Sequence, residues 1–417
     1  MQPCRILIVN AYAIPPAQPG GTRHYSLARA LTARGHTPSI VASGFDHVTR
    51  TDRLAPGERF RRELHGGVPF LWLHTPGYRG SGGAARLWNM LVFARQVEHR
   101  LVRHLDPRPD LVVGSSPHLF GALAALRLAR RLGVPFVLEL RDVWPESLVE
   151  VMGVPRWHPL VWYMARMERQ LYRAADHIVT LLPAVGRRVA ARGGDPEAIT
   201  WVSNGIDLDL LPPVAEPEPR DTFTFLYAGA HGRTNALDVL LDAAALLRDR
   251  PLPRLRLVLL GAGPEKARLQ ARARAEGLTS LEFLPPVPKQ EVYRTLAQAD
   301  AFWVSSHPTR LWEHGISFNK LFDYMAMGRP TVIGLAGPNN PIAEADCGIT
   351  VRPGDAAAMA AGMEQLLALG PEVRRAMGRR GRAHVAAQCD CRVLAARFET
   401  ALQAAQQTHR GRAGHAR

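Results

Sequence analysis

The feature that most constrains this chain is a repeated alternation of short apolar runs with amphipathic helical segments. "RILIVNAY" at 5–12 is followed by an amphipathic segment at 21–35 and by a second apolar run, "PSIVAS", at 38–43. Further runs of this kind lie at 110–116, 135–142, 177–182 and 199–204. Runs rich in β-branched residues suit strands that are buried on both faces, and intervening helices connect such strands in parallel. The pattern predicts a doubly wound α/β sheet.

The alternation stops once and then starts again. "LLPPVAEPEPRD" at 210–221 is rich in proline and acidic residues and has no periodicity, which is typical of a linker. Beyond it we expect strands at 223–229, 254–263, 281–284, 301–306 and 329–334, with helices near 234–248, 264–276 and 319–327. A chain of 417 residues is long for a single core. We therefore predict two Rossmann-like domains, at 1–204 and 205–384, and a terminal segment at 385–417 in which a helix crosses back to the first domain and a basic tail frays.

Ligands of open parallel sheets bind beyond the carboxyl ends of the strands, so the expected cleft lies between the two domains. Two glycine loops follow strands in a way that suits a phosphate. Gly20 and Gly21 precede a helix, and Gly261 and Gly263 stand in "LLGAGPEK" before another. Free backbone N–H groups and the positive end of a helix attract anions at such places. Plain turns remain the alternative for each loop, because neither is a complete dinucleotide fingerprint.

The segment "SFNKLFDYMAMGRP" at 317–330 is a stronger candidate site. If a helix begins near Asn319, then Lys320 lies in its first turn and Asp323 follows on the same face. The lysine can hold a diphosphate, and the carboxylate can accept hydrogen bonds from ribose hydroxyls. A local salt bridge between the two on a solvated face is the alternative. The apolar neighbours make the helix mostly buried, and buried charges need partners.

Charge is also concentrated at the end of an apolar strand, in "ELRDVWPES" at 139–147. Loops that follow strands carry function more often than cores do. We expect Asp142 to position an acceptor hydroxyl or a donor sugar, with Arg141 and Glu146 organising the site. A pair that only fixes the loop is the alternative.

The chain carries a formal charge of +15, with 52 Lys and Arg against 37 Asp and Glu. Such a charge suits nucleic acid, an anionic membrane or phosphorylated substrates, and it also suits an arginine-rich composition without function. The four cysteines have no disulfide or zinc spacing, which fits reduced thiols in the cytoplasm. No stretch reaches the ~20 apolar residues of a membrane span. The basic segment at 84–104 contains Trp88 and Phe93 and is predicted to lie at an anionic membrane surface, or else to pack on the sheet.

Seven segments taken together resemble glycosyltransferase family 4, the retaining enzymes of the GT-B fold, and most closely the N-acetylfucosaminyltransferase-like branch of bacterial surface-polysaccharide enzymes. In chain order they are "PPAQPGGTRHYSLARALTARGH", "LRDVWPESL", "SNGID", "YAGAHGRTNALDVLLDAA", "LLGAGPEKARL", "FLPPVPKQEV" and "SFNKLFDYMAMGRP". They span nearly the whole chain.

The resemblance implies an α/β GT-B architecture of two doubly wound domains that face a central cleft. It also implies transfer of a sugar, N-acetylated in this branch, from a nucleotide-sugar donor to a lipid-pyrophosphate-linked saccharide, without a metal or other cofactor. The enzyme would act at the inner face of the cytoplasmic membrane in O-antigen, capsule or exopolysaccharide assembly. The implied donor-binding residues are Gly20, Gly21, Arg233, Gly261, Gly263, Val287, Ser317, Asn319, Lys320 and Asp323.

One departure affects the donor sugar. The family pattern places a glutamate eight residues before the position of Asp323, where this chain has Gly315. Glu313 or Ser317 could replace it, or the main chain could contact the sugar.

Two other classes remain as alternatives. A non-hydrolysing UDP-sugar 2-epimerase shares the fold, and a basic nucleic-acid-binding protein would suit the charge. The scattered arginines and the lack of a binding module disfavour nucleic acid as a partner.

Overall fold

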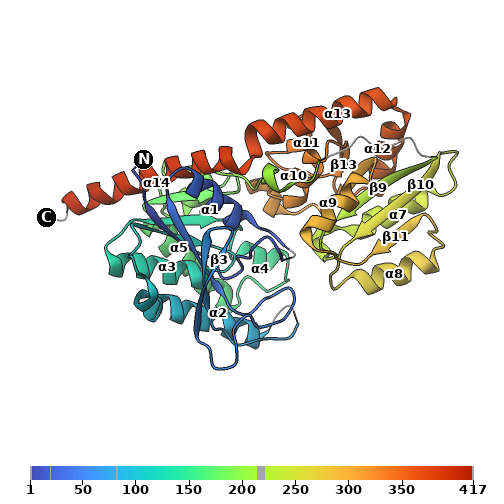
Figure 1. Ribbon diagram of the computed structural model, residues 1–417. Coiled ribbons are helices and arrows are strands. Elements are labelled where there is room, and N and C mark those ends of the chain that lie inside the picture. Colours follow the sequence, from blue (N-terminus) through green and yellow to red (C-terminus); the bar gives the residue numbers. More distant parts are fainter. Residues whose placement is uncertain (1, 19, 81–82, 214–220, 416–417) are drawn as a thin grey trace. The chain divides into compact units, whose positions relative to one another are not determined.

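The computed structural model describes residues 2–18, 20–80, 83–213 and 221–415. The chain divides into a first unit, Met1–Ser203 with Cys391–Arg417, and a second unit, Asn204–Asp390 (Figure 1). We expected the boundary after residue 204, and the observed division falls after Ser203. The expected linker at 210–221 lies largely outside the described residues.

In the described part of the first unit, eight strands form one sheet in the order β3-β4-β2-β1-β5-β6-β7-β8. Its strands are β1 (Arg5–Val9), β2 (Thr37–Ser43), β3 (Phe60–His65), β4 (Val68–Leu73), β5 (Leu111–Ser115), β6 (Phe136–Leu140), β7 (His177–Thr180) and β8 (Ile199–Trp201). Its helices are α1 (Arg23–Ala33), α2 (Ala84–His99), α3 (Leu119–Leu132), α4 (Glu146–Glu150), α5 (Pro159–Ala174), α6 (Gly186–Ala191) and α14 (Cys391–His415). All the pairings are parallel except that of β3 with β4.

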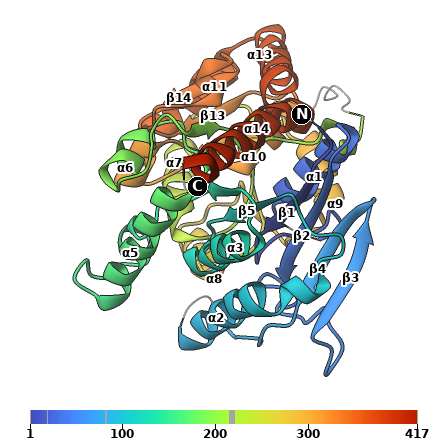
Figure 2. The ribbon, with the colours of Figure 1, turned by 90° about the vertical axis from the view of Figure 1, so that its left-hand side faces the viewer.

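Helices cover both faces of this sheet. The core on one face joins α2, α3 and α5 to the strands. The core on the other face joins α1 to α14, so the end of the chain completes the unit formed by its beginning. Figure 2 shows α14 alongside α1. Apolar residues alternate between the two cores along β1: Leu7 belongs to the first core and Ile6 to the second.

The β3–β4 hairpin is absent from the sequence prediction. Its turn consists of Gly66 and Gly67, with φ of 53° and 81°. Positive φ at both central residues defines a type I′ turn, whose twist matches antiparallel strands. The glycine pair in "HGGV" is the sequence signal that indicates it.

In the second unit, the described residues form a parallel six-stranded sheet in the order β11-β10-β9-β12-β13-β14. Its strands are β9 (Thr222–Ala228), β10 (Arg254–Leu260), β11 (Leu281–Leu284), β12 (Ala301–Ser305), β13 (Thr331–Gly334) and β14 (Gly348–Val351). Its helices are α7 (Leu237–Leu247), α8 (Lys266–Ala275), α9 (Lys289–Ala297), α10 (Asn319–Ala326), α11 (Pro341–Glu344), α12 (Ala356–Ala368) and α13 (Pro371–His384). One core holds α7, α8 and α12 against the sheet, and the other holds α9, α10 and α11.

The prediction for the terminal segment is wrong in two respects. Residues 385–390 belong to the second unit, because Val385 and Cys389 are buried in its core and the Cys389 carbonyl accepts a hydrogen bond from the Ile206 N–H at 3.0 Å. The basic tail is not frayed, since α14 continues to His415. The Arg412 guanidinium lies 2.9 Å from the Asp176 carboxylate, which ties that part of the helix to the first unit.

Two glycines bring the loops after β9 and β10 together. A Cβ at Gly261, where φ is 142°, would lie 2.0 Å from the Gly229 carbonyl oxygen. A Cβ at Gly263 would lie 2.4 Å from the His231 carbonyl oxygen. The approach lets the His231 N–H donate to the Ala262 carbonyl at 2.8 Å.

We predict that Gly261→Ala lowers the melting temperature by at least about 3 °C, because the added methyl forces the two loops apart. Gly232→Ala is the matched control: it lies in the same loop, has φ of −112°, and a Cβ there meets no atom within 4 Å. Thermal unfolding followed by circular dichroism measures both variants. An equal loss in the control would show that close packing is not the reason for the glycine.

Candidate active site

In the second unit, polar groups gather where α10 begins beside the carboxyl end of β9. The Lys320 ammonium donates to the Tyr227 hydroxyl at 2.9 Å and to the Asn235 side-chain oxygen at 2.6 Å. It also lies 4.4 Å from the centre of the Tyr227 ring. Burial lowers the pKa of Lys320 to about 7. These partners are all neutral, so the ammonium keeps its capacity to bind an anion.

The start of α10 is fixed in place and is not capped by a side chain. The Tyr324 hydroxyl donates to the Ala228 carbonyl at 3.1 Å and accepts from the Ala228 N–H at 2.7 Å, which holds the helix against β9. Asn319, the first residue of the helix, is exposed, and the Ser317 hydroxyl finds no hydrogen-bond partner among the described residues. Free N–H groups at a helix start bind anions, so these groups can act together with Lys320.

Asp323 does not pair with Lys320, so the structure does not contain the local salt bridge considered as an alternative. Its carboxylate accepts from the Lys289 ammonium at 2.7 Å and from the Tyr293 hydroxyl at 3.1 Å, both on α9. A carboxylate offers about four lone-pair directions, so Asp323 can accept further hydrogen bonds. Val287, one of the predicted residues, is half-buried just before α9.

The other predicted residues of this unit lie in different settings. Gly261 and Gly263 are explained by the packing of two loops. Arg233 is 85% exposed at its side chain and lies 3.8 Å from the Glu265 carboxylate. Gly315 has φ of 123° and ends the short 3-10 helix that contains the exposed Glu313.

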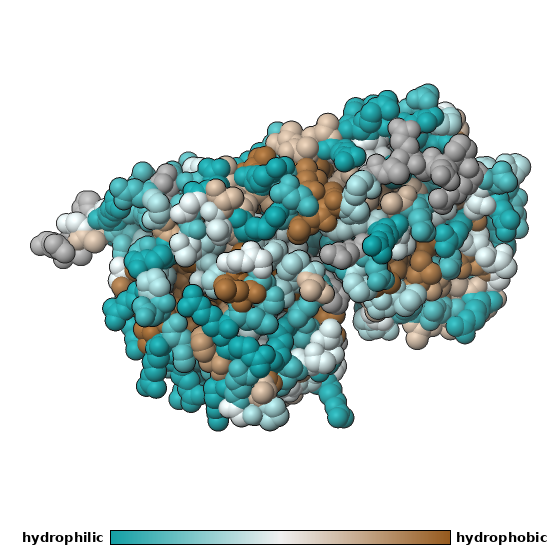
Figure 3. All heavy atoms as spheres, viewed as in Figure 1, coloured by the Kyte–Doolittle hydropathy of each residue, from teal (hydrophilic) through white to brown (hydrophobic). Residues whose placement is uncertain are grey.

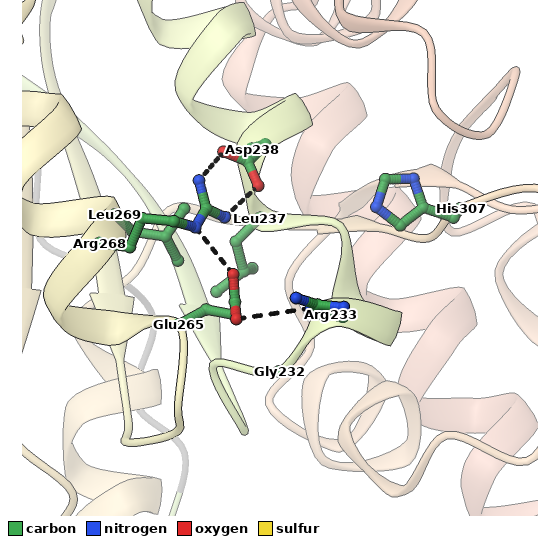
Figure 4. A pocket seen from close by; sticks show the side chains of 8 residues that line it. All are labelled: Gly232, Arg233, Leu237, Asp238, Glu265, Arg268, Leu269 and His307. Atoms are coloured by element: carbon green, nitrogen blue, oxygen red, sulfur yellow. Dashed lines mark hydrogen bonds and ion pairs between the residues drawn. The ribbon is translucent and has the colours of Figure 1, made fainter. Parts of the chain in front are cut away.

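A cavity of about 460 Å3 lies beside Arg233 (Figure 4). Figure 4 shows the carboxylates of Asp238 and Glu265 directed at the Arg268 guanidinium, with contacts of 2.6 and 2.8 Å. Its charged groups therefore largely satisfy one another. Lys320 and Asp323 are not among the residues that line this cavity.

The first unit contains a buried polar network at the carboxyl ends of β1, β5 and β6. The Glu139 carboxylate accepts from Arg23 at 2.8 Å, from the His24 ring at 2.6 Å and from the Ser115 hydroxyl at 2.6 Å. Arg23 also donates to the Val202 carbonyl at 2.9 Å and to the Ser203 carbonyl. Burial alone raises the pKa of Glu139, but its interactions with His24 and the Arg23 guanidinium hold that pKa well below the ordinary value.

This network positions the loops that the sequence singled out. It fixes the start of α1, which follows the exposed Gly20 and Gly21. Gly20 has φ of 138°, a conformation that favours glycine. The network also fixes the end of β6, after which Arg141 is half-buried and Asp142 is exposed. Asp142 is therefore available to a ligand, whereas Glu139 is not.

Glu146 has a different setting. Its carboxylate contacts the Arg188 guanidinium and lies 3.8 Å from that of Arg192. Arg188 also reaches the buried Glu168 carboxylate at 2.8 Å. These ion pairs tie α4 to α5 and α6, which fits a positioning role for Glu146 and does not fit contact with reacting atoms.

Several of these groups were not assigned a role from the sequence. Tyr227, Asn235 and Lys289 stand inside the quoted segments "YAGAHGRTN" and "PPVPKQEV", so the signal was present, but nothing in their spacing indicates contact with α10. The contacts of Arg23 and His24 with Glu139 could not be predicted either, because these residues are over a hundred positions from Glu139 in the sequence.

Two domain families match the two units. Residues 20–205 match "Glycosyl transferase 4-like domain", and residues 222–369 match "Glycosyl transferases group 1". Together these matches span most of the chain. The parallel sheets and the paired domain families define a glycosyltransferase of the GT-B type. The two matches support its assignment to glycosyltransferase family 4.

Individual proteins are similar to this chain over most of its length. A putative colanic acid biosynthesis glycosyl transferase of Escherichia coli, WcaI, is 24% identical and aligns over 81% of this chain and 86% of its own length. Sucrose-phosphate synthase from Thermosynechococcus elongatus superposes with a TM-score of 0.73 at 18% identity, covering 95% of this chain and 98% of the other. HepE of Anabaena, solved with UDP and glucose, superposes with a TM-score of 0.67 at 15% identity, covering 96% and 99%.

We predict that Glu139→Gln destabilises the protein by about 3 kcal/mol at pH 7, because the buried Arg23 loses its counter-charge. A group whose folded pKa is lowered stabilises the fold above its unfolded pKa and loses that effect as pH falls. The gap between wild type and variant should therefore shrink as pH falls below 4.5, the ordinary value for this carboxyl. Denaturant unfolding across pH measures the gap.

Glu58→Gln is the matched control, because Glu58 pairs with Arg61 near the surface of the same unit. Its stability should change little at any pH. A gap for Glu139→Gln that stays constant down to pH 3 would contradict the charged network.

Proposed function

We propose that this glycosyltransferase moves an N-acetylated hexose, with retention, from a UDP-linked donor to a saccharide on a lipid pyrophosphate. It would act in O-antigen, capsule or exopolysaccharide assembly at the cytoplasmic face of the membrane. The E. coli relative, a putative colanic acid biosynthesis enzyme, supports this type of pathway. HepE, whose crystal structure contains UDP and glucose, supports a UDP-sugar donor. No helix among the described residues is long and apolar enough to cross a membrane.

The observation that carries the proposal is the Lys320 ammonium with its neutral partners at the uncapped start of α10. A partly buried cation without a counter-charge is poised to receive an anion. On this proposal the anion is the diphosphate of a nucleotide sugar. Asp323, one turn further on, would accept hydrogen bonds from the ribose hydroxyls.

In the proposed reaction, negative charge develops on the diphosphate as the glycosidic bond breaks. Front-face attack would let the leaving diphosphate take the proton of the acceptor hydroxyl, so no strong protein base is needed. Lys320 and the N–H groups of α10 would stabilise the developing charge. On this proposal the transfer needs no metal and should continue in EDTA.

In the first unit, we assign the exposed Asp142 to the acceptor hydroxyl or the donor sugar. Arg141 would lie beside it, and Glu146 would hold the loop through its arginine partners. In the second unit, the Ser317 hydroxyl and the main chain at Gly315 would replace the glutamate that the family pattern has at this position.

Saturation-transfer NMR with UDP-, GDP-, ADP- and dTDP-sugars tests the donor class. We expect selective contact with UDP-N-acetylhexosamines. The same mixtures, incubated without acceptor, should keep the donor's configuration. A UDP-sugar epimerised at C2 would instead identify a 2-epimerase, and contact with none of the sugars would contradict the donor site.

We predict that Lys320→Ala raises the Kd for UDP at least about tenfold, as expected for loss of a charge-assisted hydrogen bond. The melting temperature should change little, because the partners of Lys320 are neutral. Arg256→Ala is the control, since Arg256 pairs with Glu282 on the neighbouring strand of the same sheet. Calorimetric titration with UDP measures both, and equal weakening in the control would show a general charge effect.

We also predict that the affinity for UDP falls as pH rises above the Lys320 pKa of about 7. The anion favours the charged lysine, so binding must raise that pKa, and Kd should rise by up to about tenfold per pH unit. The chain has three lysines, Lys266, Lys289 and Lys320. NMR of reductively 13C-methylated protein can therefore follow each one, with Lys320→Gln to assign its signal. A Lys320 signal that titrates near 10 without UDP would contradict the prediction.

A further inference from the structure

Five large apolar side chains are exposed in one short stretch of the first unit. Among the described residues, thirteen large hydrophobic side chains are exposed, and these five lie between residues 151 and 163. Trp157 is 81% exposed and Trp162 is 72% exposed, the two highest values of that set. We call the set the aromatic surface: Val151, Met152, Trp157, Trp162 and Tyr163.

The aromatic surface covers the end of α4, the loop after it and the outer side of α5. Figure 2 shows α5 as a green helix at the edge of the first unit, with the preceding loop projecting beyond it. The inner side of α5 is buried through Val161, Met164, Met167 and Leu171. Its outer side begins with Trp162 and Tyr163 and continues with arginines at helical spacing: Arg166, Arg169 and Arg173, all exposed.

The charge of this stretch is entirely positive. Residues 151–167 contain two arginines and a histidine and no carboxylate. The nearest acidic residues are engaged: Glu150 lies 3.6 Å from Arg156, and the buried Glu168 pairs with Arg188. A surface with exposed tryptophan and tyrosine beside arginine, and without acidic residues, favours binding at the interface of an anionic bilayer.

We propose that the aromatic surface docks on a membrane containing anionic lipids, with Trp157, Trp162 and Tyr163 at headgroup depth and the α5 arginines against lipid phosphates. A large exposed apolar patch rarely lacks a partner. A second copy of the chain fits less well, because a two-fold interface would place these arginines near their own equivalents. On the face shown in Figure 3, hydrophobic residues lie in small groups among many hydrophilic ones.

This proposal replaces the sequence prediction that 84–104 is the membrane segment. Phe93 on α2 is fully buried, as is Val97, because they pack on the core of the first unit. Only Trp88 and Leu91 of that helix are among the exposed large side chains. The biological use of the surface rests on the proposed lipid-linked acceptor, but the docking itself does not require it.

Sedimentation of the full chain with vesicles tests the proposal, comparing phosphatidylcholine alone with a mixture containing phosphatidylglycerol. We expect binding to the anionic vesicles that weakens at least about tenfold in Trp157→Ala/Trp162→Ala, because two rings lose their burial in lipid. Arg166→Gln/Arg169→Gln should weaken binding to anionic vesicles and make it insensitive to salt. Trp88→Ala, a similarly exposed tryptophan of the same unit, should bind as wild type does.

Unchanged vesicle binding in the Trp157/Trp162 variant, or a loss in Trp88→Ala alone, would overturn the proposal. So would a concentration-dependent dimer that the double tryptophan variant abolishes while vesicle binding is absent. Calorimetric binding of UDP by the same variants separates the two hypotheses, since it should stay unchanged. Vesicle binding by a protein that ignores UDP-sugars would support this surface and contradict the proposed function.

Discussion

Parallel strands all end at the same edge of a sheet, and the structure of this protein depends on how the polar groups at that edge are satisfied. Most of the strands are apolar and buried on both faces, so polar side chains gather at the carboxyl ends of the strands and in the loops and helix starts that follow them. Both units obey this constraint, but they satisfy it in opposite ways.

In the first unit, the buried charges at this edge of the sheet are paired with one another. The Glu139 carboxylate accepts hydrogen bonds from three side chains, and the remaining N–H groups of Arg23 donate to backbone carbonyls. A network of this kind is costly to break and holds α1 against β6. Asp142, just beyond the end of that strand, is exposed. In the second unit no such charge pairing occurs at Lys320, which among the described residues contacts hydroxyl, amide and aromatic groups. The paired network is suited to positioning, and Lys320 to binding an anion.

Two helices on the surface of the first unit differ in which of their aromatic residues are buried and which are exposed. Both α2 and α5 cover the same face of the first sheet, and each carries large apolar residues on its exposed side as well as on its buried side. In the folded protein Phe93 of α2 is buried, whereas Trp162 of α5 is exposed. On the membrane-docking proposal α5 is favoured, because its exposed Trp162 and Tyr163 continue into exposed arginines, whereas α2 exposes Trp88 and buries Phe93.

The sequence by itself determined the class of the fold, the place where one domain ends and the position of α10, because these depend on the period of apolar residues and on local breakers. It also singled out Lys320 and Asp323 as side chains that need partners, since both are polar groups in an apolar helix. What it could not provide were those partners: Tyr227 and Asn235 for Lys320, Lys289 and Tyr293 for Asp323, and Arg23 for Glu139. Each joins residues far apart in the chain, and local periodicity carries no information on such pairs. Only the packing of strands side by side decided which charge was neutralised and which was left available.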